Sequence, residues 1–148
     1  ARLNSMACVA LPTCGLSLAE SERYLPSLMN DIEEILDEVG LTQDAITIRM
    51  TGCPNGCARP YIAEIAFVGR APGTYNIHLG GGFTGNRIGG IWKRSVKGDE
   101  IADLLRPVLT RYSTERKVGE SFGDFVIRVG IIHEVTHGSE VHKEHESV

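Results

Sequence analysis

Four cysteines are the residues of this sequence whose spacing most directly indicates chemistry. Cys8 and Cys14 are separated by five residues, a gap of thirty-eight residues follows, and Cys53 and Cys57 are then separated by three. Four thiolates carried on two separate loops can converge on a tetrahedral metal ion or on an iron–sulfur cluster. The spacing therefore favours a metal centre that is built from two distant segments.

The spacing and the neighbouring residues help to choose between kinds of site. Structural zinc sites usually separate paired ligands by about two to four residues, and the five between Cys8 and Cys14 fall outside that range. Residues 51–57 read TGCPNGC, a run of turn formers that lets the backbone wrap closely and aim N–H groups at sulfur. An iron–sulfur cluster is the preferred interpretation, while zinc, disulfides and unligated thiols stay open.

The composition indicates what kind of protein carries these two loops. The chain has 148 residues, of which 42% are hydrophobic and 23% are charged, which is typical of one globular domain. A net charge of −4 gives no electrostatic footprint for nucleic acid, and no apolar run is long enough for a membrane span. The chain begins with Ala1 and not with Met, which suggests a piece of a longer protein.

Hydrophobic periodicity indicates the elements around the cysteine loops. Ser17 and Glu20 have the spacing of a capping box, which predicts a helix that begins after Ser17. An apolar stripe then predicts a second helical segment, with Pro26 in its first turn and Gly40 just past its end. Strands are predicted over residues 46–50, 62–68 and 74–79, the last two as a hairpin, and over residues 131–135. Further helices are predicted over residues 101–112, with a kink or break at Pro107, and over residues 122–129.

These elements predict one α+β (mixed α/β) unit with a mixed sheet and flanking helices. Residues 1–135 are expected to form the domain, and residues 136–148 a polar and disordered tail. Four histidines near that end could suggest a metal site: His133, His137, His142 and His145. The last three lie in the polar terminal stretch, which a disordered tail explains better than a metal site.

Longer motifs around the cysteines resemble a known family. Residues 4–14 (NSMACVALPTC), 51–57 (TGCPNGC), 75–81 (YNIHLGG) and 123–128 (GDFVIR) are similar to the carboxy-terminal sirohaem/[4Fe-4S] domain of the assimilatory sulfite reductase haemoprotein (beta) subunit. This family belongs to the nitrite/sulfite reductase superfamily. The resemblance covers nearly the whole chain up to about residue 135, and it implies a nitrite/sulfite reductase [4Fe-4S] domain-like fold.

The resemblance also implies cofactors and residue roles. Cys8, Cys14, Cys53 and Cys57 would hold a [4Fe-4S] cluster, and Cys57 would in addition ligate the iron of sirohaem and so take part in catalysis. Asn55 is a candidate for contact with the cofactors. The implied reaction is the six-electron reduction of sulfite to hydrogen sulfide, in sulfate assimilation and cysteine biosynthesis. The remainder of the subunit would be a necessary partner, so the chain alone is expected to be inactive.

Two further sets of residues are weaker candidates. An anionic substrate and the carboxylates of sirohaem need cationic neighbours, and four cations lie in or near loops that could face the macrocycle or simply solvent: Arg59, Arg87, Lys93 and Arg94. Gly80–Gly82 could let the backbone approach a cofactor, although the segment lacks the context of a nucleotide site.

Alternatives follow from the same motifs. One is a nitrite reductase of the same superfamily, and another is a non-catalytic iron–sulfur or zinc module. The electron donor implied for a sulfite reductase is either an NADPH-dependent flavoprotein subunit or ferredoxin. Neither nucleic acid nor a membrane is an expected partner, and the expected location is the cytoplasm, or the plastid for a plant-type enzyme.

Overall fold

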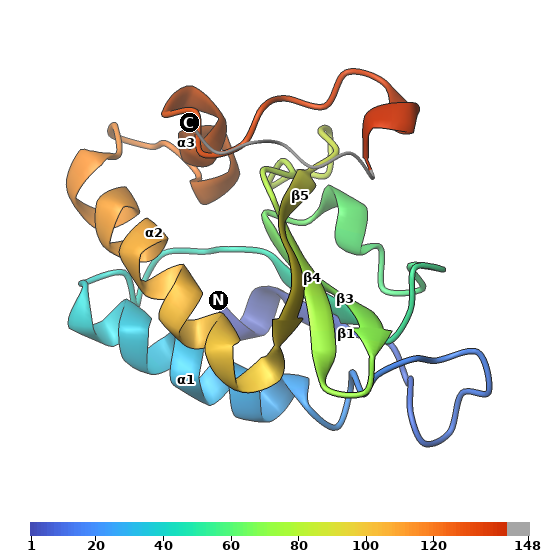
Figure 1. Cartoon of the computed structure of the whole chain (residues 1–148). Helices are drawn as coiled ribbons and strands as arrows, with labels where there is room; N and C mark the ends of the chain where they lie inside the picture. The colour runs from blue at the N-terminus through green and yellow to red at the C-terminus, as the bar shows by residue number, and fades with distance from the viewer. Residues whose placement is uncertain (142–148) are drawn as a thin grey trace.

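A five-stranded mixed sheet forms the centre of the protein (Figure 1). The structure is a computed structural model, and it describes residues 1–141. The strands lie side by side in chain order, the first two pairings parallel and the last two antiparallel. Their bounds are β1 Ser5–Ala7, β2 Ile48–Thr51, β3 Ile65–Ala71, β4 Thr74–Leu79 and β5 Gly90–Lys97.

Three helices complete the fold, which confirms the predicted α+β class. They are α1 Leu25–Glu38, α2 Ile101–Glu115 and α3 Phe122–Arg128. Helices α1 and α2 pack beside each other on one side of the sheet, and α3 lies near the far end of α2 (Figure 1). Over residues 1–141, no helix is both long enough and apolar enough to cross a membrane.

Helix α1 follows the sequence prediction at both ends. Pro26 lies in its first turn, where a missing backbone N–H costs nothing. At its other end Gly40 has a φ of 78°, a left-handed conformation that glycine adopts without strain. The N–H of Leu41 then bonds the carbonyl of Leu36 at 2.7 Å, and the N–H of Gly40 that of Asp37 at 3.2 Å, which together make a Schellman motif.

The main core lies between the sheet and helices α1 and α2. Apolar side chains from one face of the strands join the buried stripe of each helix in a single cluster. Strand β3 is buried on both faces from Ile65 to Gly69, as its continuous apolar sequence predicts. The aromatic rings of Tyr112, Phe122 and Phe125 pack together between α2 and α3, as core residues.

Several predicted elements differ from the structure. The helix predicted after a capping box at Ser17 is wrong: Ser17 Oγ instead donates to the carbonyl of Ala19, and Glu20 bridges to Ala10. The N–H groups of Leu18 and Ala19 donate to the carbonyl of Gly52, which holds this segment against the loop after β2 and prevents it from forming a helix.

Other boundaries are corrected by local packing. The strand predicted over residues 62–68 is β3, which starts at Ile65, because residues Pro60–Ile62 form a 3-10 turn, η2. Helix α2 continues through Pro107, since buried residues on both sides of the proline hold its two halves to the core. No strand forms over residues 131–135, where the N–H groups of Ile131 and Ile132 both bond the carbonyl of Val126.

Strands β1 and β5 were not predicted, and the end of the chain was predicted as a tail. Strand β1 has only three residues, and β5 begins at the last glycine of a glycine-rich segment, so neither shows a clear alternation. Residues 136–141 include a 3-10 turn, Gly138–Glu140, and buried Val141. The domain boundary at residue 135 stays a prediction, and His142 and His145 lie outside the described residues.

Two glycines bring the segments after β1 and β2 into close contact. A Cβ on Gly52 would lie 2.0 Å from Ser17 Oγ and 2.5 Å from the Cβ of Ala10. A Cβ on Gly69, in the neighbouring strand, would lie 2.3 Å from the carbonyl oxygen of Gly52. Side chains at these positions would therefore force the backbone segments apart.

We expect Gly52→Ala to lower the free energy of unfolding by about 1–3 kcal/mol, because the new methyl group overpacks a rigid backbone contact. Gly15→Ala is the matched control, since no atom lies within 4 Å of a Cβ at that position. Urea unfolding of both variants measures the difference. Equal midpoints for the two variants would show that the backbone at Gly52 has room to move.

A second prediction concerns the ion pair that fastens α3. Arg128 Nε and Nη2 donate to the two carboxylate oxygens of Glu120 at 2.7 and 2.8 Å, and the N–H of Lys117 adds a third bond. The hydrogen bonds from Arg128, first of all, lower the pKa of Glu120 from 4.5 to about 2. A carboxyl whose pKa is lower in the folded state stabilises the protein above its unfolded pKa, and this contribution is lost on acidification towards the folded pKa.

The stability difference between the wild-type protein and Glu120→Gln should therefore narrow as the pH falls from about 6 to about 3. Urea unfolding of both proteins at several pH values in this window measures the difference in stability. The contributions of the other carboxyl groups are the same in both proteins and cancel in this difference. A difference that does not change with pH would contradict the role of this ion pair.

Candidate functional site

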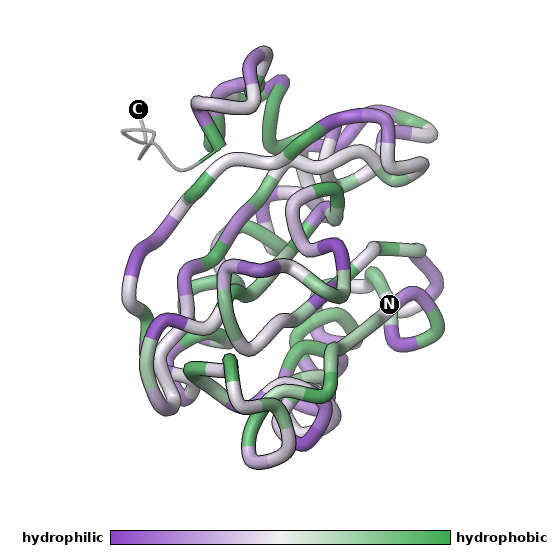
Figure 2. The backbone as a smooth tube through the Cα atoms, turned by 90° about the vertical axis from the view of Figure 1, so that its right-hand side faces the viewer, coloured by the Kyte–Doolittle hydropathy of each residue, from purple (hydrophilic) through white to green (hydrophobic). Residues whose placement is uncertain are grey.

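The parallel pairing of β1 with β2 brings the two cysteine loops together. Ala7, the last residue of β1, is in register with Met50 of β2, so both strands end at the same edge of the sheet. Cys8 follows β1 directly, and Cys53 comes two residues after the end of β2. Both loops lie away from α1 and α2 in Figure 1, and Figure 2 views the molecule from that side.

All four cysteines line one cavity of about 210 Å³. Cys8, Cys14 and Cys53 are partly buried, whereas Cys57 is exposed, and no disulfide joins any of the four. Apolar side chains complete the wall, among them Val9 and Leu16. The structure thus brings together every cysteine that the sequence singled out.

Hydrogen bonds reach two of the sulfur atoms. The backbone N–H of Gly52 donates to Cys8 Sγ at 3.3 Å, and Asn55 Nδ2 donates to Cys57 Sγ at 3.4 Å. Donors of this kind stabilise the negative charge of a thiolate and tune the potential of a cluster bound to it. Asn55 also lines the cavity, which is the position expected of a residue near a cofactor.

The two loops are tied to each other through their backbones. The N–H of Cys8 donates to the carbonyl of Met50 at 3.2 Å, and those of Leu18 and Ala19 donate to the carbonyl of Gly52 at 2.9 and 3.0 Å. Cys14 is placed by a turn, in which its N–H donates to the carbonyl of Ala10 at 2.8 Å. The cysteines are therefore set by backbone geometry more than by side-chain packing.

The loop with Cys53 and Cys57 has further supports that the sequence did not reveal. Thr51 Oγ1 donates to the carbonyl of Cys53 at 3.1 Å, and Tyr61 Oη donates to that of Pro54 at 2.6 Å. Burial, and then the nearby charge of Cys53, raise the pKa of Tyr61, so its hydroxyl stays protonated and acts as a donor. The dense run of turn formers points to a tight loop, but no sequence signal marks Tyr61.

The arrangement of the four sulfur atoms differs from that of a single-ion site. Over residues 1–141, no three His, Cys, Asp or Glu side chains lie close enough together to hold one metal ion. A tetrahedral zinc with Zn–S bonds of about 2.3 Å would bring its four sulfurs within about 3.8 Å of one another. A cubane cluster, which takes one thiolate on each of its four irons, needs a wider arrangement around a central space.

The four candidate cations do not line the cysteine cavity. Arg87 Nε donates to the carbonyl of Gly80 at 2.7 Å, and its Nη2 lies 2.8 Å from Asp124 Oδ1. Lys93 lies over the ring of Trp92, and Arg94 is exposed on β5. Arg59 is exposed just after Cys57 and has a φ of 52°.

The glycine-rich segment serves internal packing in the described structure. A Cβ on Gly81 would lie 2.1 Å from the carbonyl oxygen of Ala63, and one on Gly123 would lie 1.9 Å from that of Gly81. The segment is thus buried against η2 and α3. His133 and His137 are exposed, and among residues 1–141 they belong to no metal-ligand group.

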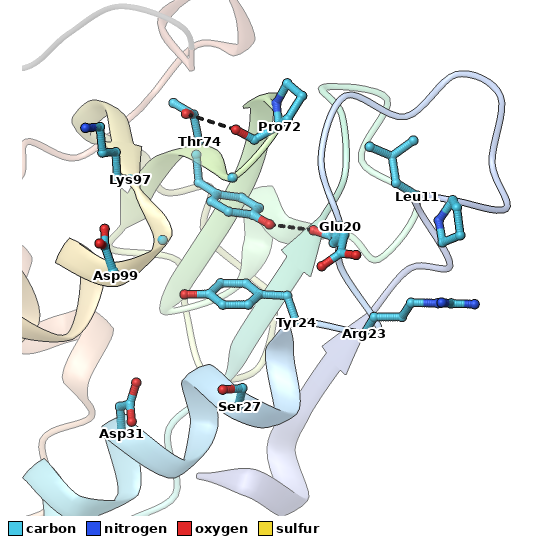
Figure 3. A pocket seen from close by; sticks show the side chains of 14 residues that line it. Leu11, Glu20, Arg23, Tyr24, Ser27, Asp31, Pro72, Thr74, Lys97 and Asp99 are labelled. Carbon is cyan, nitrogen blue, oxygen red and sulfur yellow. Dashed lines mark hydrogen bonds between the residues drawn. The ribbon is translucent and has the colours of Figure 1, made fainter.

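A larger cavity, of about 920 Å³, lies on another part of the surface and is lined by no cysteine (Figure 3). It opens between the start of α1 and the turn before β4, where the rings of Tyr24 and Tyr75 stack at 5.7 Å. Tyr75 Oη donates to the carbonyl of Glu20 at 2.7 Å. Its rim mixes acidic and basic side chains, so it offers no clear preference for a charged ligand.

Comparison with known proteins identifies relatives of the whole described region. The family model for the nitrite and sulphite reductase 4Fe-4S domain matches residues 1–136. The sulfite reductase [NADPH] hemoprotein beta-component of Staphylococcus saprophyticus is 61% identical over 141 residues, which cover 95% of this chain and 25% of that protein. The sulfite reductase [NADPH] subunit beta of Schizosaccharomyces pombe is 59% identical over 147 residues, 99% of this chain and 10% of that protein.

A solved structure gives the same result for the fold. The Mycobacterium tuberculosis NirA protein superposes with a TM-score of 0.66 at 32% sequence identity, covering 86% of this chain and 25% of that one. The chain thus spans about a quarter of the length of the bacterial relatives it matches. Matched over nearly its full length by the family model and by relatives about 60% identical to it, the chain belongs to the nitrite and sulphite reductase 4Fe-4S domain family.

Proposed function

We propose that Cys8, Cys14, Cys53 and Cys57 hold the [4Fe-4S] cluster for which this family is named. The observation that carries the proposal is that all four thiols line one cavity although they come from two distant segments. The partly apolar wall and the N–H donors to Cys8 and Cys57 fit a negatively charged cluster. Over residues 1–141, no three potential ligands lie close enough together for a single ion, which favours a cluster over zinc.

The proposal extends to the protein of which this chain spans a part. We place the chain in a sulfite reductase that reduces sulfite to hydrogen sulfide with six electrons, in sulfate assimilation and cysteine biosynthesis. Relatives about 60% identical to the chain carry the name sulfite reductase hemoprotein, which supports this reaction and sirohaem as the second cofactor. When bound, the cluster and the sirohaem supply one-electron transfers to the sulfur atom of the substrate.

Cys57 is the residue best placed to join the two cofactors. It is the exposed member of the four, so its sulfur can make a second contact on the outer side of the cavity. Asn55 donates to that sulfur and keeps it oriented. A thiolate shared by both groups would give electrons a covalent path. Cys57 is therefore the proposed catalytic residue of this chain, and Asn55 a proposed cofactor contact.

The proposal includes a donor and a location. The names of the bacterial and fission yeast relatives include NADPH, which supports delivery of electrons through an NADPH-dependent flavoprotein subunit over delivery by ferredoxin. Four unpaired thiols at one site fit a reducing compartment, and the proposed location is the cytoplasm.

Nitrite reduction is the second candidate function. The family description names both nitrite and sulphite, so the fold serves either reaction. The named sulfite reductases are about 60% identical to the chain, which favours sulfite. Turnover of the complete subunit with each anion would decide, and a preference for nitrite would overturn the proposed substrate.

The cluster itself can be tested on the complete subunit that contains this chain. Metal analysis should find iron and acid-labile sulfide, and the absorption spectrum should show macrocycle bands above the broad iron–sulfur absorption. Zinc without iron would refute the cluster, and an iron–sulfur spectrum without macrocycle bands would refute sirohaem.

Cys57→Ser in the complete subunit should lower sulfite turnover more than about 100-fold, because the shared thiolate is lost. Sulfide production from sulfite with a reduced dye as donor is the measurement, with Ser113→Ala, far from the cavity on α2, as the control. Wild-type turnover by Cys57→Ser would remove this residue from the proposed electron path.

The isolated chain should produce no sulfide, because the described cations that could bind an anion do not line the cysteine cavity. The assay is the same, with the chain after reconstitution with iron and sulfide. Measurable sulfide production by the chain alone would show that it contains a complete active site.

A further inference from the structure

Tyr61 is fixed on three sides beside the loop with Cys53 and Cys57. Its hydroxyl donates to the carbonyl of Pro54 at 2.6 Å. Its ring lies against Gly56, where an added Cβ would be 2.9 Å from the ring carbon Cε2. On the sheet side, the ring meets the buried imidazole of His78, on β4, edge to face at 5.4 Å. Tyr61 therefore connects the loop to the rigid sheet.

The contacts of Tyr61 with Pro54 and with Gly56 lie on either side of Asn55 in the sequence. Pro54 precedes Asn55 and is held through its carbonyl, and Gly56 follows it and is packed under the ring. Gly56 has a φ of 73°, which glycine adopts without strain, and its lack of a Cβ leaves room for the ring. With the residues on both sides fixed, the amide of Asn55 is directed at Cys57 Sγ, which it reaches at 3.4 Å.

Other hydrogen bonds hold the two ends of this loop. Thr51 and the N–H of Gly56 both bond the carbonyl of Cys53, at 3.1 and 3.4 Å, and so hold the start of the loop. The N–H of Arg59 bonds the carbonyl of Gly56 at 2.9 Å and holds its end. Between these points, the Tyr61 hydroxyl is the side-chain donor that fixes Pro54.

We propose that Tyr61 is a positioning residue that sets the reduction potential of the metal centre by holding the Asn55 amide on Cys57 Sγ. The inference rests on the proposed cluster site and adds a residue that tunes it. A donor to a cluster sulfur favours the reduced and more negative form, so losing it lowers the potential. Tyr61 acts through Asn55, because its hydroxyl donates to the carbonyl of the preceding residue, Pro54.

The first test is a redox titration of the complete subunit, followed by the EPR signal of the reduced cluster. Tyr61→Phe keeps the ring against Gly56 and His78 but removes the hydroxyl, and the cluster should titrate at a lower potential than in the wild-type protein. Tyr112→Phe is the matched control. It removes a similar bond, from Tyr112 Oη to the carbonyl of Glu120 at 2.8 Å, between α2 and α3, and should leave the potential unchanged.

A double-mutant cycle shows whether the effect passes through Asn55. Asn55→Ala alone should lower the potential, and adding Tyr61→Phe to it should cause little further change, because the donor that Tyr61 positions is already gone. Additive shifts would mean that Tyr61 acts by another route, and this would overturn the inference.

A second readout does not depend on a loaded cluster. Hydrogen exchange of the complete subunit without its cofactors should show amides of residues 55–59 exchanging about two- to tenfold faster in Tyr61→Phe, as expected for the loss of one hydrogen bond. Tyr112→Phe should show no change there. Unchanged exchange in Tyr61→Phe would show that the hydroxyl does not hold the loop.

The outcomes separate this inference from the proposed function. A wild-type subunit that binds no iron refutes the cluster proposal, whatever the hydrogen exchange shows. A wild-type subunit with a cluster whose potential is the same in Tyr61→Phe refutes the role of Tyr61 and leaves the cluster proposal standing.

Discussion

The parallel contact between β1 and β2 is the constraint on which the candidate site depends. Cys8 and Cys53 are far apart in the sequence, and they meet because Ala7 pairs in register with Met50 at the edge where both strands end. Gly52 then allows the segment with Ser17 to lie directly on the loop. Without this backbone contact, four thiols on two loops would have no common cavity.

The rest of the fold makes that contact rigid. A three-residue strand has little stability of its own, so β1 relies on β2, which is in turn held by the buried strand β3. Helix α1 covers the face behind them and ends in a Schellman motif that directs the chain into β2. The core therefore determines where strands β1 and β2 end, and the strand ends determine where the two cysteine loops lie. The loops themselves need few side-chain contacts.

The sequence was most informative where local chemistry decides structure. The apolar stripe ending at Gly40 predicted α1, and the turn formers around Cys53 predicted a close-wrapped loop. Prediction failed where tertiary contact decides: Ser17 has the pattern of a helix cap, yet the segment it starts is held by Gly52, and β1 is too short to show a period. Tyr61 was missed because its role depends on a fold in which it reaches back to Pro54.

The charges near these loops support the proposal that residues elsewhere bind the anionic substrate. Arg87 is paired with Asp124, and Lys93 lies over Trp92, so both are already engaged elsewhere in the described structure. Arg59 is the candidate cation that lies in the loop, directly after Cys57 and Ala58. Arg49 reaches the same loop, where its Nη1 donates to the carbonyl of Arg59 at 3.1 Å, but neither arginine lines the cysteine cavity. A cavity lined by four thiols and by none of these cations is suited to hold an electron-transfer group, while the proposed anion would be bound by other residues.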